Sequence, residues 1–216
     1  MKKASPRNFT TSADGSLTMW VPKLDEHYHS IHGAKTESQH VFIDAGLMAF
    51  EKEAVSILEV GLGTGLNAKL TLEQKGNRSI TYFALEKFPL AAEEIAEIRA
   101  LGHELEANLL SVIPGQKHTF APGFDFELST QDLRTFTTAQ PSFDLIYFDA
   151  FAPSAQPELW SQEIFKNMYN ALLPGGMLTT YCAKGVVKRT MKAVGFEVEA
   201  LPGPPRKREM TRAWKR

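Results

Sequence analysis

The segment 58-LEVGLGTGLNAKL-70 decides how this chain folds. It completes the apolar run VSILEV (55–60), which predicts a buried strand, and it continues through three glycines at alternate positions into a helical pattern over residues 66–75. A glycine-rich turn between a strand and a helix lets the backbone approach a ligand closely. The segment therefore predicts an α/β fold that holds a nucleotide-like ligand at this turn.

The spacing of the glycines distinguishes between possible ligands. The nicotinamide and flavin fingerprint is G-x-G-x-x-G, whereas this chain has Glu59, Gly61, Gly63 and Gly65 in the order E-x-G-x-G-x-G. That order is the common first motif of enzymes that use S-adenosylmethionine (AdoMet). Its glycines admit backbone close to the cofactor, and its acid can accept from the cofactor's ammonium group, directly or through water. No Gly-Lys-Ser/Thr follows, so a P-loop is excluded and AdoMet is the expected cofactor.

Strand-like and helix-like segments alternate beyond the glycine turn, which predicts a parallel sheet with helices on both faces. The last two strands are joined by a turn too short for a crossover helix, so they should pair antiparallel. The expected fold class is α/β, a class I (Rossmann-like) AdoMet-dependent methyltransferase with a mostly parallel seven-stranded sheet and a terminal antiparallel hairpin. The expected strands are 55–60, 79–86, 125–134, 143–151, 176–182 and one on each side of PGPPRKR (202–208), and the expected helices are 66–75, one long helix from Pro89 to Ile113, 157–172 and 184–195.

Three acids stand at the ends of successive expected strands, where an open α/β sheet binds its ligand. Glu86 is expected to bind ribose hydroxyls, and Asp132 to lie near the adenine amino group. Methyl transfer is an in-line displacement that needs alignment and an unprotonated nucleophile. Asp149 could orient an amine nucleophile and take its proton. The residues expected to wall the substrate pocket, or to stack on a base, are Phe151, Pro153 and Trp160.

That assignment has a structural alternative. Asp149 could instead cap the turn that follows it, and Phe151 could belong to the hydrophobic core. The place of Asp149 at the end of the fourth expected strand favours a functional role.

The composition is that of a globular protein in a reducing compartment. The 216 residues fit one domain, with 43% hydrophobic and 23% charged residues. The single cysteine, Cys182, rules out an internal disulfide. No apolar run approaches the roughly 18 residues of a membrane span, and the N-terminus has no apolar signal segment. We therefore expect a cytoplasmic protein with no membrane association.

Residues 1–54 differ in pattern from residues 55–216. They contain polar turns, a probable hairpin around Ala13–Ser16 and the helix-like run VFIDAGLMAF (41–50). We expect them to form an N-terminal extension that packs on the sheet, while residues 55–216 form the AdoMet-dependent methyltransferase domain.

The net charge of −1 conceals an asymmetry. Residues 184–216 hold ten Lys and Arg against three Glu, a net charge of +7, so the rest of the chain carries −8. A basic end on an acidic body is consistent with nucleic-acid binding, although a solvated terminal helix would look the same on charge alone.

The chain resembles the MnmD methyltransferases and the methyltransferase half of the bifunctional MnmC proteins. The resemblance covers nearly the whole chain, and its D-A-F-A-P…P-x-x-W block is more specific than the glycine turn. The segments that carry it are 14-DGS-16, 28-YHS-30, 33-GAKTESQHVFIDAGL-47, 59-EVGLGTGLNA-68, 149-DAFAPSAQPELW-160, 195-GF-196 and 206-RKREMTRA-213.

This resemblance implies a reaction and a partner. The family methylates the aminomethyl group of 5-aminomethyl-2-thiouridine at the tRNA wobble position, using AdoMet, and separate enzymes would supply that precursor. MnmC proteins also carry an FAD-dependent domain that removes a carboxymethyl group. This chain ends at Arg216 without a G-x-G-x-x-G fingerprint, so no FAD domain and no oxidase activity are expected.

The resemblance also implies roles for the two ends of the chain. Residues expected to lie over the AdoMet pocket as a lid are Tyr28, Ser30, Glu37 and Ser38. Residues expected to contact tRNA phosphates near the pocket mouth are Arg206, Lys207 and Arg208. His27, His29 and His32 lie close together in the sequence, but no cysteine or spaced acid accompanies them, so no metal site is expected.

Three alternatives remain open at the level of the sequence. A small-molecule AdoMet enzyme, such as an amine methyltransferase or aminopropyltransferase, would share the glycine turn and the acid of the fourth strand, but would have no use for the basic end. A nicotinamide oxidoreductase is disfavoured by the glycine spacing. A non-enzymatic RNA-binding module would not need Glu59, Glu86 and Asp149 together.

Overall fold

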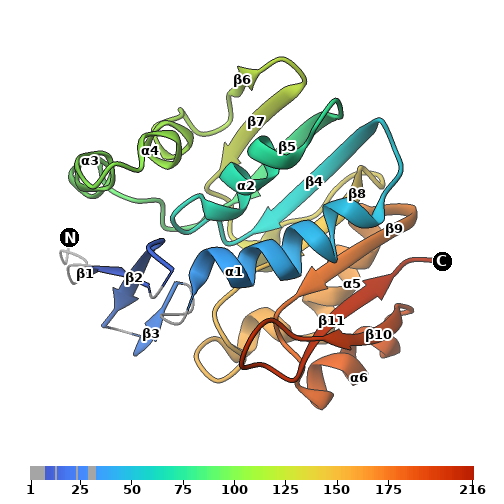
Figure 1. Cartoon of the computed structure of the whole chain (residues 1–216). Helices are drawn as coiled ribbons and strands as arrows, with labels where there is room; N and C mark the ends of the chain where they lie inside the picture. Colours follow the sequence, from blue (N-terminus) through green and yellow to red (C-terminus); the bar gives the residue numbers. More distant parts are fainter. Residues whose placement is uncertain (1–7, 13, 23, 29–32) are drawn as a thin grey trace.

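The computed structural model describes residues 8–12, 14–22, 24–28 and 33–216. Its centre is an eight-stranded sheet in the order β10-β11-β9-β8-β4-β5-β7-β6, in which β9, β8, β4, β5 and β7 are mutually parallel (Figure 1). The strands are β4 (Ala54–Val60), β5 (Ser79–Leu85), β6 (Lys117–Ala121), β7 (Phe124–Ser129), β8 (Phe143–Phe148), β9 (Leu172–Thr180), β10 (Glu197–Pro202) and β11 (Glu209–Trp214). The predicted α/β class and the antiparallel terminal hairpin β10–β11 are confirmed.

Helices cover both faces of this sheet, and each face has its own hydrophobic core. One face packs against α2 (Leu66–Gln74), α3 (Ala92–Ala100) and α4 (Glu104–Leu110). The other packs against α5 (Gln162–Ala171) and α6 (Gly185–Ala193). Because side chains alternate along a strand, Ile57 of β4 belongs to the first core and Leu58 to the second. This double covering explains why the central strands read as continuous apolar runs.

Three predictions about the elements are wrong in detail. The sheet has eight strands because β6 pairs antiparallel with β7 at the edge; this short strand carries polar residues and was not recognised. The long helix expected from Pro89 to Ile113 is two helices, because the chain turns at Gly102 with a positive φ of 89°. The third expected strand ends at Ser129, before Asp132.

The N-terminal residues form a small three-stranded sheet and a helical segment. The sheet contains β1 (Asn8–Thr11), β2 (Leu17–Val21) and β3 (Glu26–His27), and the β1–β2 pairing confirms the expected hairpin. The helical segment begins earlier than expected, as α1 (Ala34–Ser38), continues as the π-helix η1 (Gln39–Asp44) and is followed by the 3₁₀ turn η2 (Leu47–Ala49). Met19 and Phe42 from this region lie in the same core as β4 and β5.

The β1–β2 turn caps the start of α1. The helix begins at Gly33, which has no side chain to cap it. Instead, Asp14 Oδ2 accepts from the Thr36 amide at 3.0 Å, and Ser16 Oγ accepts from the Lys35 amide at 3.0 Å. The N-terminal hairpin thereby holds α1 in place beside the large sheet.

Asp144, near the start of β8, links this strand to β4 by hydrogen bonds. Its Oδ2 accepts from the amide and the hydroxyl of Ser56, both at 2.9 Å, and its Oδ1 accepts from Lys52 Nζ at 2.5 Å. Although burial opposes ionisation, these donors lower the pKa of the Asp144 carboxyl.

We predict that Asp144→Ala lowers the free energy of unfolding by about 1–3 kcal/mol at pH 7, because the Ser56 amide loses its acceptor in a partly buried position. The folded-state pKa of Asp144 is depressed, so this contribution is present above an unfolded pKa near ~3.9 and is lost as the pH falls below it. Urea unfolding at pH 7 and at pH 3 measures the difference. Lys52→Ala is the matched control and should cost less, since the Lys52 side chain is 49% exposed.

Candidate active site

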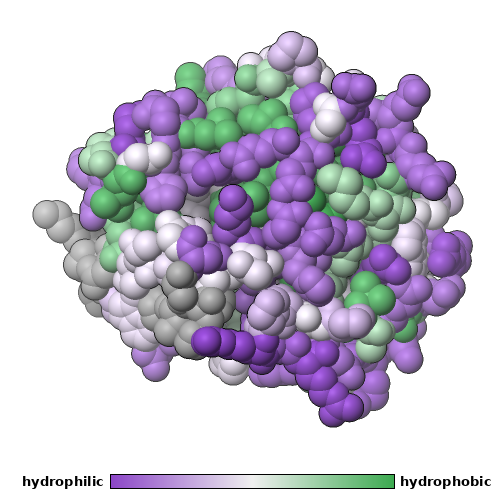
Figure 2. All heavy atoms as spheres, in the orientation of Figure 1, coloured by the Kyte–Doolittle hydropathy of each residue, from purple (hydrophilic) through white to green (hydrophobic). Residues whose placement is uncertain are grey.

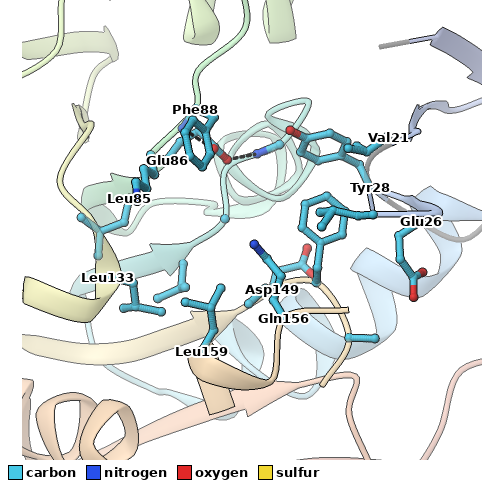
Figure 3. Close-up of a pocket in the computed structure, with 18 of the residues that line it drawn as sticks. Val21, Glu26, Tyr28, Leu85, Glu86, Phe88, Leu133, Asp149, Gln156 and Leu159 are labelled. Atoms are coloured by element: carbon cyan, nitrogen blue, oxygen red, sulfur yellow. Dashed lines mark hydrogen bonds between the residues drawn. The ribbon is translucent and has the colours of Figure 1, made fainter. Parts of the chain in front are cut away.

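A cavity of about 730 Å³ opens beyond the carboxyl ends of β4, β5 and β8 (Figure 3). The N-terminal strands contribute Glu26 and Tyr28 on one side of it, and Leu85 and Leu133 lie on the other. Asp149 follows β8 and faces the space between them. The sequence-predicted residues that line the cavity are Tyr28, Glu37, Ser38, Gly61, Gly63, Glu86, Asp132, Asp149, Phe151 and Lys207.

The glycine turn is built so that other chain segments can touch its backbone. Gly61 and Gly63 have φ values of 87° and 55°, a region that side chains rarely adopt. A Cβ at Gly61 would lie 2.6 Å from the Asp149 carbonyl oxygen, and a Cβ at Gly63 would lie 2.7 Å from the Tyr28 ring. Gly65 is the left-handed N-cap residue of α2 and lies outside the cavity lining. The first two glycines therefore shape the cavity, and the third starts the helix.

Glu86 holds the glycine turn to the end of β5. Its Oε2 accepts from the Gly63 amide at 3.3 Å and its Oε1 from the Phe88 amide at 2.9 Å (Figure 3). The side chain lines the cavity while making these contacts. A carboxylate fixed by backbone donors at this position suits the expected hydrogen bonds to ribose hydroxyls.

Glu59 lies beneath the cavity and is not part of its lining. The residue is fully buried, and its carboxyl oxygens accept from Asn67 Nδ2 and from Tyr82 OH, each at 2.9 Å. Burial raises the pKa of Glu59 well above its usual range, and these two hydrogen bonds oppose that rise. Glu59 is therefore connected to the cavity residue Asp149 through Asn67.

Asn67 connects Glu59 to Asp149. Its Nδ2 also donates to Asp149 Oδ2 at 2.9 Å, so one amide group serves two carboxyl groups, an arrangement that we call the Asn67 bridge. Burial raises the pKa of Asp149 to about 7, although the hydrogen bond from Asn67 lowers it; Glu37 raises it further and Lys207 lowers it. A carboxyl group with this pKa can exchange a proton near neutral pH.

Asp132 forms ion pairs with Lys87 and Arg134. Its carboxylate accepts from Lys87 Nζ at 2.5 Å and from the side chain and amide of Arg134. These bonds, the one from Arg134 above all, hold the pKa of Asp132 far below its usual range. Asp132 also caps the 3₁₀ turn η3 (Leu133–Thr135). It lines the end of the cavity where adenine was expected, but its oxygens already have strong donors.

The aromatic residues of the predicted substrate pocket have different roles. Phe151 lines the cavity and packs edge-on against Tyr28, with ring centroids 5.0 Å apart. Trp160, in the 3₁₀ turn η4 (Pro157–Trp160), is buried in the core, where its Nε1 donates to the Phe151 carbonyl at 2.8 Å. Trp160 thus orients the loop and does not wall the pocket. Pro153 is partly buried and lies outside the lining.

The turn between β10 and β11 brings one basic residue into the cavity. Lys207 Nζ pairs with Glu37 Oε1 at 2.5 Å and lies 4.9 Å from the centroid of the Tyr181 ring. Arg206 and Arg208 are exposed and are not part of the lining. Strongly hydrophilic residues gather along the lower edge of the face shown in Figure 2, where Figure 1 places this turn and α6.

Some predictions fall on residues that the structure does not describe. Ser30, His29 and His32 lie outside the described residues, and so does the side chain of His27. Within the described ranges, no group of three His, Cys, Asp or Glu side chains is arranged to hold a metal ion. In the same part of the chain, no helix has the length and apolar character needed to cross a bilayer.

Sequence reasoning missed several residues of the site. Tyr181, just after β9, lines the cavity and donates to the Ala150 carbonyl at 2.9 Å. Gln156 also lines the cavity. Asn67 stands inside the quoted glycine motif, but its role depends on Asp149, which is 82 positions away in the chain. Only the register of β4 and β8 could have indicated that pairing.

The charges of the lining fit a cationic ligand. The acidic lining residues are Glu26, Glu37, Glu86, Asp132, Asp149 and Glu158, and the basic ones are Lys87, Arg134 and Lys207. All three basic residues pair with carboxylates of the same lining. A pyrophosphate would therefore meet an excess of acid, whereas a sulfonium with ribose hydroxyls and an ammonium group would find acceptors.

Comparison with known proteins gives the family. Residues 96–216, more than half of the chain, match a family model described as S-adenosyl-L-methionine-dependent methyltransferase. A curated relative from Leptospira interrogans, the tRNA 5-methylaminomethyl-2-thiouridine biosynthesis bifunctional protein MnmC, is 32% identical over 215 residues. That match covers 90% of this chain and 33% of the relative, so the chain spans about a third of the relative's length.

Two solved structures have similar folds. MNMC2 from Aquifex aeolicus has a TM-score of 0.79 at 22% identity, covering 100% of this chain and 72% of that one. Spermidine synthase from Thermotoga maritima has a TM-score of 0.62 at 13% identity, covering 100% of this chain and 70% of that one. The glycine turn, the acidic cavity and the family match agree, and the chain belongs to the S-adenosyl-L-methionine-dependent methyltransferases.

Proposed function

We propose that this enzyme transfers a methyl group from AdoMet to the aminomethyl nitrogen of 5-aminomethyl-2-thiouridine at the tRNA wobble position, giving 5-methylaminomethyl-2-thiouridine. The support from sequence is the MnmC relative, whose name refers to this modified nucleoside and which aligns with 90% of the chain. Only a third of that relative is matched, so its reaction is assigned here as a proposal.

The single observation that carries the proposal is the position of Asp149 in the cavity, with a pKa raised to about 7. An alkylamine is protonated at neutral pH, as a lysine side chain is with its pKa near ~10.4, and it must lose a proton before it can act as a nucleophile. Asp149 can accept hydrogen bonds from the N–H groups of the amine, which orients the nitrogen lone pair, and it can receive the proton that the amine loses. The raised pKa of Asp149 lies closer to the pKa of the amine than the pKa of an ordinary aspartate does.

Other residues would hold AdoMet, which supplies an electrophilic methyl group on a sulfonium. Glu86 and the backbone at Gly61 and Gly63 are suited to its ribose and amino-acid portions. Leu85 and Leu133 offer an apolar surface to its adenine. Tyr28, Glu37 and Ser38 cover the cavity from the N-terminal side and would act as the lid.

The proposal extends to the protein's surroundings. Arg206 and Arg208 are exposed beside the cavity residue Lys207, where they would contact tRNA phosphates. Separate enzymes would supply the aminomethyl precursor. The reaction would take place in the cytoplasm, where tRNA is modified.

One alternative reaction has a specific observation in its favour. The fold is shared with a spermidine synthase, and an aminopropyltransferase or small-amine methyltransferase would use the same acidic cavity. Such an enzyme would act without RNA. The nicotinamide alternative would place a pyrophosphate among carboxylates, and a non-enzymatic RNA module would not need the Asn67 bridge.

We predict that Asp149→Asn lowers the rate of methyl transfer from labelled AdoMet to tRNA by about 10²–10⁴, because the variant cannot accept the proton. AdoMet affinity, measured by calorimetry, should change only a few-fold. The wild-type rate should fall as the pH drops below about 7, since Asp149 then becomes protonated. The variant should lack this break near pH 7, and its rate should instead rise steadily with pH as the fraction of unprotonated amine rises.

Asp125→Asn is the control, because Asp125 lies on β7 and its carboxylate pairs with Lys117 and Thr119, outside the cavity lining. Near-normal turnover of Asp149→Asn would reduce Asp149 to a cap of the turn that follows it. Label transfer to small amines in place of tRNA would favour the alternative reaction.

We predict that Arg206→Ala with Arg208→Ala raises the apparent KM for tRNA and lowers its salt dependence by about 0.7–0.9 in log–log slope per lost phosphate contact. Lys207 is left intact because it pairs with Glu37 inside the cavity. Arg99→Ala on α3 serves as the control, since that exposed arginine pairs with Glu104 and is not part of the lining. Unchanged tRNA kinetics in the double variant would contradict the assignment of this turn as an RNA contact.

A further inference from the structure

Asn67 is a buried polar residue in an otherwise apolar position. It is the second residue of α2, it is 1% exposed, and Leu66, Ala68 and Leu70 around it belong to hydrophobic clusters. An apolar side chain would suit both the helix and the burial better than an amide. The amide must therefore be explained by what it contacts.

Both contacts of Asn67 Nδ2 are with carboxyl oxygens. Glu59 Oε1 and Asp149 Oδ2 each lie 2.9 Å from it, so both amide hydrogens are committed. The Asn67 Oδ1 atom is buried and has no hydrogen-bond partner. With both carboxyl groups ionised, an amide turned the other way would direct its oxygen at two acceptors, whereas this orientation directs its donors at them. The side chain of Asn67 therefore makes two hydrogen bonds through Nδ2, while its side-chain oxygen Oδ1 makes none.

The strand register explains why the two carboxyl groups meet at Asn67. In the parallel pairing of β4 with β8, Glu59 lies opposite Tyr147 and Val60 opposite Phe148. Because side chains alternate, Glu59 and Asp149 emerge on the face covered by α2. Two carboxyl groups so placed repel one another when both are ionised, unless a donor lies between them.

We propose that Asn67 is a positioning residue of the methyl transfer, whose amide favours the ionised form of Asp149 and fixes its orientation beside the carboxyl group of Glu59. This inference rests on the proposed role of Asp149. It assigns to the glycine motif a second task besides binding the cofactor, which is to deliver the donor that prepares the proton acceptor.

Other charged and titratable groups surround Asp149. Among the described residues, those that face it or interact with it electrostatically are Glu37 of α1, Lys207 of the β10–β11 turn, Glu59 of β4, Tyr82 of β5 and Tyr181 after β9. Lys207 is the one cation of this group, and it is paired with Glu37. Loss of Asn67 would therefore leave Asp149 among groups that mostly favour its protonated form.

The direct test is a titration of Asp149 in the protein without ligand. The ¹³C resonance of its carboxyl carbon, assigned by its absence from Asp149→Asn, is followed against pH in the wild type and in Asn67→Leu. Leucine is close to asparagine in shape, suits a buried helical position and has no donor. We expect the midpoint to rise by about one pH unit, as the loss of a hydrogen bond to a charged group implies. Asn67→Ala gives the same test if the leucine variant does not fold.

Two controls separate this effect from a general disturbance. Thr71→Val, one turn along α2, removes a hydroxyl that donates to the backbone carbonyl of Asn67 and bonds to Tyr147 OH. This change should leave the Asp149 midpoint unchanged. Tyr82→Phe removes the other donor of Glu59 and should not raise the midpoint, because Tyr82 donates to Glu59 and not to Asp149. A midpoint that stays the same in both Asn67 variants would overturn the proposal.

Kinetics give a second reading that separates this proposal from the proposed function. If the wild type methylates tRNA, the acidic limb of the rate–pH profile of Asn67→Leu should lie at higher pH than that of the wild type. The difference should equal the shift of the Asp149 midpoint. The rate of Asn67→Leu should partly recover at high pH, which a merely structural defect would not allow. A rate lost equally at every pH, with an unmoved midpoint, would contradict the role of Asn67. Absence of tRNA methylation by the wild type would instead contradict the proposed function and leave the titration to judge Asn67.

Discussion

The site depends on the close parallel pairing of β4 with β8. Past the last paired residues, the Asp149 amide donates to the Val60 carbonyl at 2.9 Å, and the chain then passes so near Gly61 that a Cβ there would lie 2.6 Å from the Asp149 carbonyl oxygen. This contact fixes Asp149, the proposed proton acceptor, relative to the glycine turn. Glycine is required because the approach is close and because φ is positive. The glycine turn and Asp149 are therefore held against one another by the backbone.

Burial opposes the ionisation of the carboxyl groups around the cavity, and neighbouring donors offset this effect to different extents. Asp132 is paired with Lys87 and Arg134, so it stays ionised. Asp149 accepts from Asn67, and burial raises its pKa to about 7. A cationic ligand would favour ionisation of the carboxyl groups that line the cavity, so under the proposed function cofactor binding and activation of Asp149 would support one another. The same acidic lining would favour a sulfonium over a pyrophosphate and would prepare the proposed base.

Much of this arrangement could be predicted from the sequence, because strong local patterns encode it. The glycine turn, the apolar strands and the acids Glu86 and Asp149 at their ends follow from periodicity and from the position of ligands in open α/β sheets. What failed depends on long-range geometry. Trp160 packs into the core, and the hydrogen bonds that Glu59 accepts from Asn67 and Tyr82 could not be predicted from the sequence. The edge strand β6 and the break between α3 and α4 were missed because their signals are short and polar.

Identification of the nucleoside that receives the methyl group tests the account most directly. The enzyme would be incubated with methyl-labelled AdoMet and with tRNA from cells that lack it, and the tRNA would then be digested to nucleosides and separated. The account predicts label in 5-methylaminomethyl-2-thiouridine, on an exocyclic amine that Asp149 can deprotonate. Label on a base carbon or a ribose oxygen, or no label on tRNA while AdoMet still binds, would contradict it.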